Sequence, residues 1–139
     1  MIDSMARYIK IERYGFDAVH ENVLTFHVPH TQQITLGADA QYEPLYVLKG
    51  VCLYAKSTQK VKKLQVTYAF RRDNFIRWSG DCSISQPDAT FELLATNISG
   101  YDVPFDSTTY NLDIEYAGEL FSTGDVRIVF LLIFAVYGR

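Results

Sequence analysis

Two carboxylates alternate along one segment of the chain at a spacing that could support acid–base chemistry. In Asn111-Leu112-Asp113-Ile114-Glu115, the two acids are two residues apart, so a β-strand would project both from one face. Glycoside hydrolysis uses a pair of neighbouring carboxylates. In jelly-roll glycosidases that carry both carboxylates on one strand, a further acidic residue lies two positions earlier. Here that position is Asn111, whose amide cannot act as a nucleophile. We therefore interpret the segment as the solvated outer face of a strand and expect no catalytic residue.

The histidines and cysteines are the candidate metal ligands. A strand would direct His27 and His30 to opposite faces, and His20 is further away in the sequence. Cys52 and Cys82 are far apart and do not form a metal-type pair. The sequence therefore predicts no metal and no cofactor. Two reduced, buried thiols are favoured, and a single disulfide stays open as the alternative.

Charge is unevenly distributed along this chain of net charge −3. Residues 56–77 contain seven Lys or Arg and one acid, whereas residues 78–126 contain nine acids and no Lys or Arg. Either the segments form opposite surfaces suited to contacts between copies, or they pair across neighbouring strands. Lys60, Lys62 and Lys63 lie in or beside an expected loop and are candidate assembly residues. The acidic total argues against nucleic acid as a partner.

The strongest structural signal is the segment 126–137, which is apolar at every position except Arg127. Its uninterrupted part is about half the length of a transmembrane helix, which needs about 20 residues, so we expect no transmembrane segment. Its β-branched and aromatic residues favour a strand. Both faces are apolar, which predicts a central strand. Two interpretations of this strand are equally supported. It is either an ordinary central strand of a sandwich, or a strand that also contacts a partner through Phe130, Leu132 and Phe134.

Alternating apolar and polar positions predict about eight strands separated by turn residues. The alternation is strictest over 109–116, where Tyr110, Leu112, Ile114 and Tyr116 should face inward. The expected turns include Arg72-Asp73-Asn74, Ala117-Gly118 and Ser122-Thr123-Gly124-Asp125. The expected ranges are 7–14, 22–28, 32–36, 45–55, 61–70, 74–78, 90–96 and 109–116, followed by the closing segment. No stretch has sustained helical periodicity. We expect one all-β domain over residues 1–139, an antiparallel, jelly-roll-like sandwich; another Greek-key or immunoglobulin-like sandwich is the alternative.

No motif in the sequence indicates a reaction. We interpret the chain as a non-enzymatic structural subunit that assembles with copies of itself or with companion subunits. In size, strand number and closing strand it resembles small jelly-roll virion subunits, which implies a coat, spike or decoration protein. A carbohydrate-binding module is the alternative, and a small hydrolase using Asp113 and Glu115 is third. Residues 1–7 lack the basic region and apolar stretch of a signal peptide, so we expect synthesis in the cytoplasm. A virion is one possible final location, and the sequence identifies no other.

Overall fold

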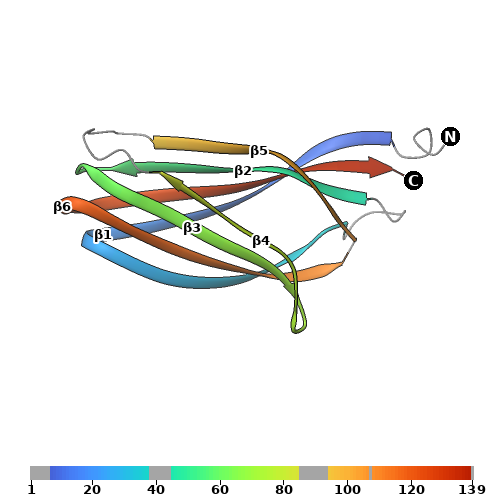
Figure 1. Cartoon of the computed structure of the whole chain (residues 1–139), viewed down its shortest axis with the longest axis horizontal. Coiled ribbons are helices and arrows are strands. Elements are labelled where there is room, and N and C mark those ends of the chain that lie inside the picture. Colours follow the sequence, from blue (N-terminus) through green and yellow to red (C-terminus); the bar gives the residue numbers. More distant parts are fainter. Residues whose placement is uncertain (1–6, 38–44, 85–93, 107, 139) are drawn as a thin grey trace.

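Six antiparallel strands form the protein in the computed structural model (Figure 1). They are β1 (Arg7–Thr35), β2 (Leu45–Ser57), β3 (Val61–Arg72), β4 (Phe75–Ile84), β5 (Leu94–Phe105) and β6 (Thr109–Gly138). The structure describes residues 7–37, 45–84, 94–106 and 108–138, and none of these lies in a helix. Accordingly, this part of the chain contains no helix able to cross a membrane. The prediction of an all-β protein is confirmed.

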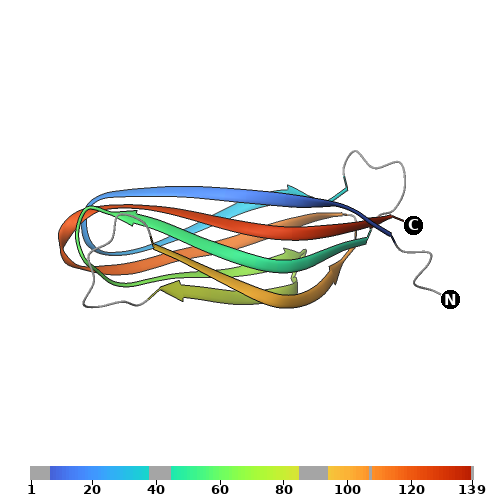
Figure 2. The same ribbon diagram turned by 90° about the horizontal axis from the view of Figure 1, so that it is seen from above.

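Strands β1 and β6 form one antiparallel ribbon that folds back on itself. Its register runs from Arg7 opposite Gly138 to Thr35 opposite Thr109, with shifts on either side of Val23. Figure 2 shows both strands turning together at one end of the molecule. Each strand is therefore shared between two layers.

The bend of the ribbon is held by hydrogen bonds from three parts of the chain. Asn22 has a φ of 53°, a left-handed conformation that Asn adopts more readily than most residues. Its N–H donates to Asp125 Oδ1 at 3.0 Å. The Asp125 N–H donates to Thr58 Oγ1 at 2.9 Å, and the Thr58 N–H donates to the Asp125 carbonyl at 3.0 Å. The turn that the sequence predicts over residues 122–125 lies in this bend.

The bend divides the ribbon between two facing sheets. In the first sheet, residues 7–20 and 126–138 join β2 and β5; in the second, residues 23–35 and 109–119 join β3 and β4. If β1 and β6 are each divided at the bend, the chain has eight strands, numbered one to eight from the N-terminus. In this numbering the first sheet has the strand order 1-8-3-6 and the second sheet has the order 2-7-4-5. This is the arrangement of an eight-stranded jelly roll, so the predicted sandwich is confirmed.

The structure has fewer and longer strands than the sequence predicts. The expected strands 22–28 and 32–36 are both parts of β1. The expected turn at Ala117-Gly118 lies inside β6. A Cβ atom on Gly118 would lie 2.5 Å from Phe26 Cζ and 2.6 Å from Leu64 Cδ2, so this glycine makes room for core side chains instead of forming a turn. Residues 90–93 of the expected strand 90–96 lie outside the described residues, and the rest belongs to β5.

The core between the sheets is rich in aromatic side chains. Every second residue of β6 faces inward, and the ring centroids of Tyr68 and Phe130, from opposite sheets, are 5.2 Å apart. Phe70 and Phe105 also meet across the sheets, at 4.7 Å. Because side chains alternate between faces, this inward set fixes the register of the ribbon.

Candidate functional site

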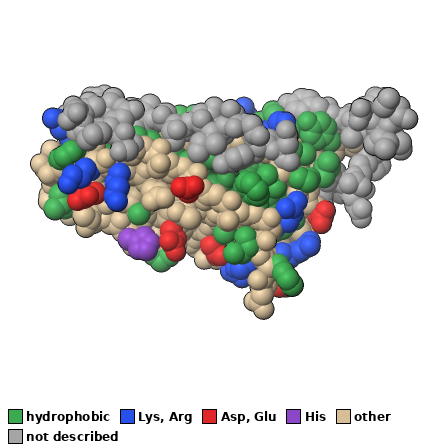
Figure 3. All heavy atoms as spheres, viewed as in Figure 1, with side chains coloured by type: hydrophobic (Ala, Val, Ile, Leu, Met, Phe, Trp, Pro, Cys, Tyr) green, Lys and Arg blue, Asp and Glu red, His purple; other side chains and the backbone are tan. Residues whose placement is uncertain are grey.

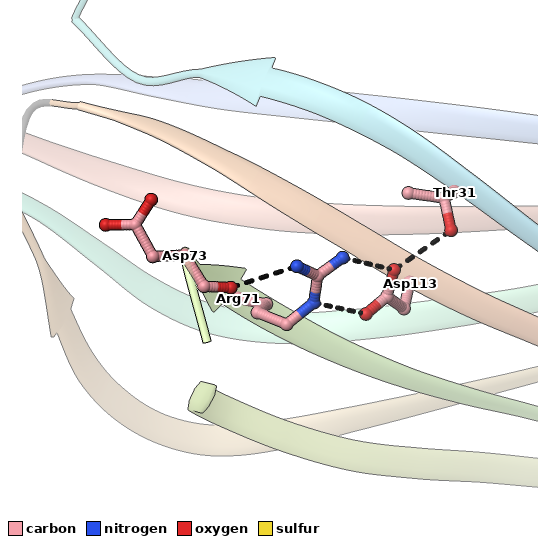
Figure 4. Close-up of polar contacts among 4 residues, drawn as sticks. All are labelled: Thr31, Arg71, Asp73 and Asp113. Atoms are coloured by element: carbon pink, nitrogen blue, oxygen red, sulfur yellow. Dashed lines mark hydrogen bonds and ion pairs between the residues drawn. The ribbon is translucent and has the colours of Figure 1, made fainter. Parts of the chain in front are cut away.

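Asp113 and Glu115 lie on the outer face of the second sheet, as their alternation predicts. The Asp113 carboxylate accepts hydrogen bonds from Arg71 Nε at 3.0 Å and Thr31 Oγ1 at 2.9 Å (Figure 4). The hydrogen bond from Arg71 lowers the pKa of Asp113. Glu115 lies 3.2 Å from His27 Nε2. A glycosidase acid needs a raised pKa, so Asp113 is unsuited to that role.

The three histidines point to different surroundings. The ring of His20 stacks on Phe26 with centroids 4.3 Å apart, and burial lowers the pKa of His20. His27 is exposed on the second sheet, and His30 Nε2 lies 3.3 Å from the Gln32 amide oxygen. Among the described residues, no three His, Cys, Asp or Glu side chains are grouped so that they could hold a metal ion.

Cys52 on β2 and Cys82 on β4 are buried, and neither is joined in a disulfide. Burial raises the pKa of Cys82 to about 12. The thiolate is the reactive form of cysteine, so Cys82 is poorly suited to nucleophilic chemistry. The structure therefore favours two reduced thiols over the disulfide that the sequence left open.

The basic and acidic segments meet inside the chain, because β3 of the first is hydrogen-bonded to β6 of the second. Three ion pairs join them: Arg71–Asp113 at 3.0 Å, Lys62–Glu119 at 3.6 Å and Arg72–Asp106 at 3.8 Å. In Figure 3, cationic and anionic side chains accordingly lie close together on this side of the molecule. These contacts support pairing across neighbouring strands over two separate charged surfaces.

The three lysines singled out in the sequence lie near the bend of the ribbon. Lys60 is exposed in the β2–β3 connection, and Lys63 is exposed on β3. Lys62 pairs with Glu119, and its ammonium lies 5.4 Å from the centre of the Phe121 ring. Their part in an interface stays a prediction.

The closing segment, residues 126–137 of β6, lies between β1 and β2 in the middle of the first sheet. Phe130, Leu132 and Phe134 are fully buried and face the second sheet. An interface of this strand must therefore use its other face, where Leu131 and Ile133 are half-buried.

The two outer faces of the sandwich differ in chemistry. On the first sheet, β6 and β2 place apolar side chains in register on the outer side, which we call the apolar outer face: Val129, Leu131, Ile133, Ala135, Val47, Cys52 and Tyr54. Val47, Cys52 and Ala135 are buried, the other four are half-buried, and the neighbouring strand β1 adds the exposed Arg13 and Asp17 to this side of the sheet. The matching face of the second sheet is polar on β6, β3 and β1: Asn111, Asp113, Glu115, Glu119, Lys63, Gln65, Thr67, Arg71, Thr31 and Gln33. A sandwich with two solvated faces would have polar side chains on both.

Two adjoining depressions lie where the apolar outer face approaches the bend. They have volumes of about 200 and 230 Å³ and share Lys56 and Arg127. Tyr54 and Val129 line the first, and Val19, 59% exposed, lines the second. This end of the face therefore combines apolar walls with charges of both signs, because Glu21 and Asp125 also line the second depression and Arg127 is paired with Asp17.

A cleft of about 340 Å³ lies along β1, where the two arms of the folded strand face each other. Its lining includes Asp17, His30 and Gln32 together with apolar Val28 and Tyr116. No local sequence pattern indicates this cleft, because it forms only when β1 folds back on itself.

The β3–β4 hairpin carries two exposed apolar residues that the sequence analysis assigned only to a short strand. Phe75 is 80% exposed and Ile76 is 64% exposed. They follow the turn residue Asp73, whose φ is 54°. The turn signal Arg72-Asp73-Asn74 directly before two large apolar residues could have indicated a projecting apolar tip.

No protein-family model matches the sequence, and no curated protein matches it. Among solved structures, the chain is similar to the carbohydrate-binding module TmCBM61 in complex with β-1,4-galactotriose, with 12% identity, 96% of this chain and 93% of that chain covered, and a TM-score of 0.44. It is also similar to the infectious bursal disease virus Gx strain structure (9% identity, 95% and 37% covered, TM-score 0.43) and to the VP2 subviral particle of that virus (8%, 94% and 40%, 0.39). The chain thus spans less than half of the two viral chains. Identities and TM-scores this low carry no argument about function.

Proposed function

We propose that the protein is a non-enzymatic structural subunit that assembles with copies of itself through its apolar outer face. The observation that carries the proposal is the difference between the two outer faces of the sandwich. The second sheet presents charged and polar side chains to water, whereas the first presents Val129, Leu131 and Ile133. Burial of apolar surface is the main driving force of association, so the first face gains most from a covering copy.

The half-buried state of these side chains is consistent with such a role. Leu131 lies against Gly15 of the neighbouring strand, whose added Cβ would be 3.0 Å from Leu131 Cδ2. The surface is therefore closely packed across β1 and β6, and a flat, packed apolar surface suits contact with a second protein surface.

In its most concrete form, the subunit belongs to a virion as a coat, spike or decoration protein. Eight-stranded jelly rolls occur in viral capsids and also in lectins and cupins, so the fold is compatible with this role without requiring it. The Asp113 carboxylate is held by Arg71 and Thr31, and Cys82 is buried, which is consistent with structural roles for both side chains.

Measuring the mass of the assembly tests the proposal. We expect wild-type protein to exceed the 15.9 kDa mass of one chain in light scattering at micromolar concentrations. The double variant Leu131→Lys, Ile133→Lys places two charges in the apolar outer face and should shift the mass toward that of one chain. Electron microscopy of the wild-type assembly would then show whether it has virion-like symmetry.

The matched control adds the same charge to the polar outer face. Gln65→Lys with Thr67→Lys changes two exposed residues on β3 and should leave the mass as in wild type. Wild-type protein that stays at the mass of one chain under all conditions would overturn the proposal.

The cleft along β1 favours a second candidate function, the binding of a carbohydrate. Sugar rings need polar partners for their hydroxyl groups next to apolar walls, and the cleft offers Asp17, His30 and Gln32 beside Val28. A nuclear magnetic resonance titration with soluble trisaccharides would test it. Shifts confined to amides of the cleft would support this function, and unchanged spectra at millimolar sugar would exclude it for those sugars.

A further inference from the structure

The projecting tip of the β3–β4 hairpin exposes two large apolar side chains to solvent. We call Phe75 and Ile76, which are 80% and 64% exposed, the knob. In Figure 1 the hairpin extends beyond the rest of the second sheet, and apolar side chains lie near its tip in Figure 3. Two large exposed apolar residues on a projecting turn are a common feature of contact sites.

The depression lined by Tyr54, Val129, Lys56 and Arg127 has the size to accept one of these side chains. Its volume is about 200 Å³, and a cavity of about 150 Å³ is sufficient for benzene. By volume, this open depression is therefore large enough to accept a phenyl ring such as that of Phe75.

Charges of both signs lie beside the knob and the depression: Arg72 and Arg77 flank Asp73 and the knob, and Glu21 and Asp125 line the adjoining depression next to Lys56. Asp73 and Lys56 are one pair of opposite charges available for a contact between copies. Arg71 Nη1 donates to the Asp73 carbonyl at 2.9 Å, and the Asp73 carboxylate points away from Arg71 (Figure 4). Lys56, at the depression, is exposed and has no ion-pair partner among the described residues. An incoming knob would bring the Asp73 carboxylate toward Lys56.

The knob and the depression lie too far apart to meet within one chain. Strand β3 begins beside the bend, close to Thr58, and ends at the knob. Its 12 residues span about 40 Å at about 3.3 Å per residue. The two features therefore lie far apart in one chain, and Figure 1 shows the start of β3 at the bend of the ribbon and the β3–β4 turn well away from it.

We propose that the knob of one copy inserts into the depression of the next, so that the subunits join head to tail. The inference rests on the proposed function, because it specifies how the apolar outer face is covered. Each contact leaves one free knob and one free depression, so the assembly continues as a ring or an open filament.

Two variants separate the halves of the contact. Phe75→Ser with Ile76→Ser removes the knob at exposed positions where the core is unaffected. Tyr54→Glu with Val129→Glu fills the depression with carboxylates that repel Asp73. Circular dichroism and thermal unfolding establish that each variant folds, and each alone should have the mass of one chain.

Mixing the two variants provides the decisive measurement. The Phe75→Ser, Ile76→Ser variant retains its depression, and the Tyr54→Glu, Val129→Glu variant retains its knob. An equimolar mixture should therefore give a complex of two chains, which cannot grow further because no intact knob or depression is left. Light scattering and native mass spectrometry would detect it. A reciprocal contact, in which both copies insert their knobs, would also give a complex of two chains on mixing, but its wild-type assembly would stop at two chains, whereas head-to-tail contacts continue.

The possible failures distinguish this inference from the proposed function. If wild-type protein assembles and the knobless variant assembles equally well, the knob contact is wrong and the proposed function stands. If both variants are monomeric and their mixture forms no complex, the head-to-tail arrangement is overturned. If wild-type protein has the mass of one chain, both proposals fail.

Discussion

At the bend of the β1–β6 ribbon, the imidazole of His20 lies among aromatic rings. Its ring stacks on Phe26, and its centroid is 6.4 Å from that of Tyr116. The Nε2 atom is buried without a hydrogen-bond partner among the described residues. Burial lowers the pKa of His20, because a charged imidazolium would lose its hydration there. The neutral ring therefore belongs to the folded state.

This burial makes stability depend on pH. The unfolded chain binds a proton at His20 near pH 6.5, whereas the folded chain does so only at lower pH, so the free energy of unfolding falls as pH drops through 6.5. His20→Phe keeps a stacking ring and cannot be protonated. In urea unfolding between pH 7 and pH 5, we expect this variant to lose less stability than wild type.

The control for this prediction is His30→Phe, which changes an exposed histidine of the same strand. It should retain the wild-type dependence on pH. An equal slope in wild type and His20→Phe would show that another group causes the dependence.

Among the strand elements, β6 is central to both sheets and pairs with three other strands. Its passage between sheets depends on small residues at crowded positions. Gly118 lies between Phe26 on β1 and Leu64 on β3, and both side chains would clash with an added Cβ. The strand therefore accepts no side chain there, although its pairing continues through this position.

We expect Gly118→Val to destabilise the protein by about 1–3 kcal/mol, the usual cost of overpacking a core. Ala117→Val is the matched control, because Ala117 is the adjacent half-buried residue on the outer face and valine favours strands. Urea unfolding of both variants measures the difference. Equal stabilities would mean that the core near Phe26 rearranges freely.

In the molecule as a whole, strand β6 has apolar side chains both on the face that packs in the core and on the face that points away from it. Leu132 is fully buried between the sheets, and its neighbour Leu131 lies half-buried on the apolar outer face. The two leucines are adjacent in the same apolar segment, yet one faces the core and the other faces the outer side of the first sheet. This difference gives the molecule an inside and an assembly side.

Replacing each leucine by aspartate should separate these roles. Leu132→Asp buries an unpaired charge at a cost of several kcal/mol, so we expect insoluble protein. Leu131→Asp should remain soluble and fold, because its charge reaches water. Soluble expression and thermal melting measure both effects. Cooperative folding of Leu132→Asp would contradict the central position of the strand.

Patterns local in sequence predicted much of this architecture. Strict alternation over 109–116 identified Tyr110, Leu112, Ile114 and Tyr116 as inward residues, and all four are buried. The unbroken apolar run after Arg127 indicated a central strand with two apolar faces. Both signals depend only on side-chain periodicity, which is visible without the fold.

Features that depend on strand order could not be predicted. The pairing of Arg71 with Asp113 requires β3 to lie beside β6, and a charge count along the chain cannot supply that neighbour. The continuity of β1 was missed because its bend at Asn22 is stabilised by Asp125, which is remote in sequence. The exposure of Phe75 likewise follows from how far the hairpin extends.

The pairing of β1 with β6 determines when this protein can fold during synthesis. Thr35 and Thr109 are 74 residues apart in the sequence, and Asp17 and Arg127 are 110 residues apart. Such distant pairing costs loop entropy before it gains contacts, and it slows folding. During synthesis, β1 emerges before β6, and until β6 follows its backbone groups are unpaired and Phe16 and Ile34, which are buried in the folded protein, are open to other chains. We therefore expect newly made chains to be most prone to aggregation in the interval before β6 is released.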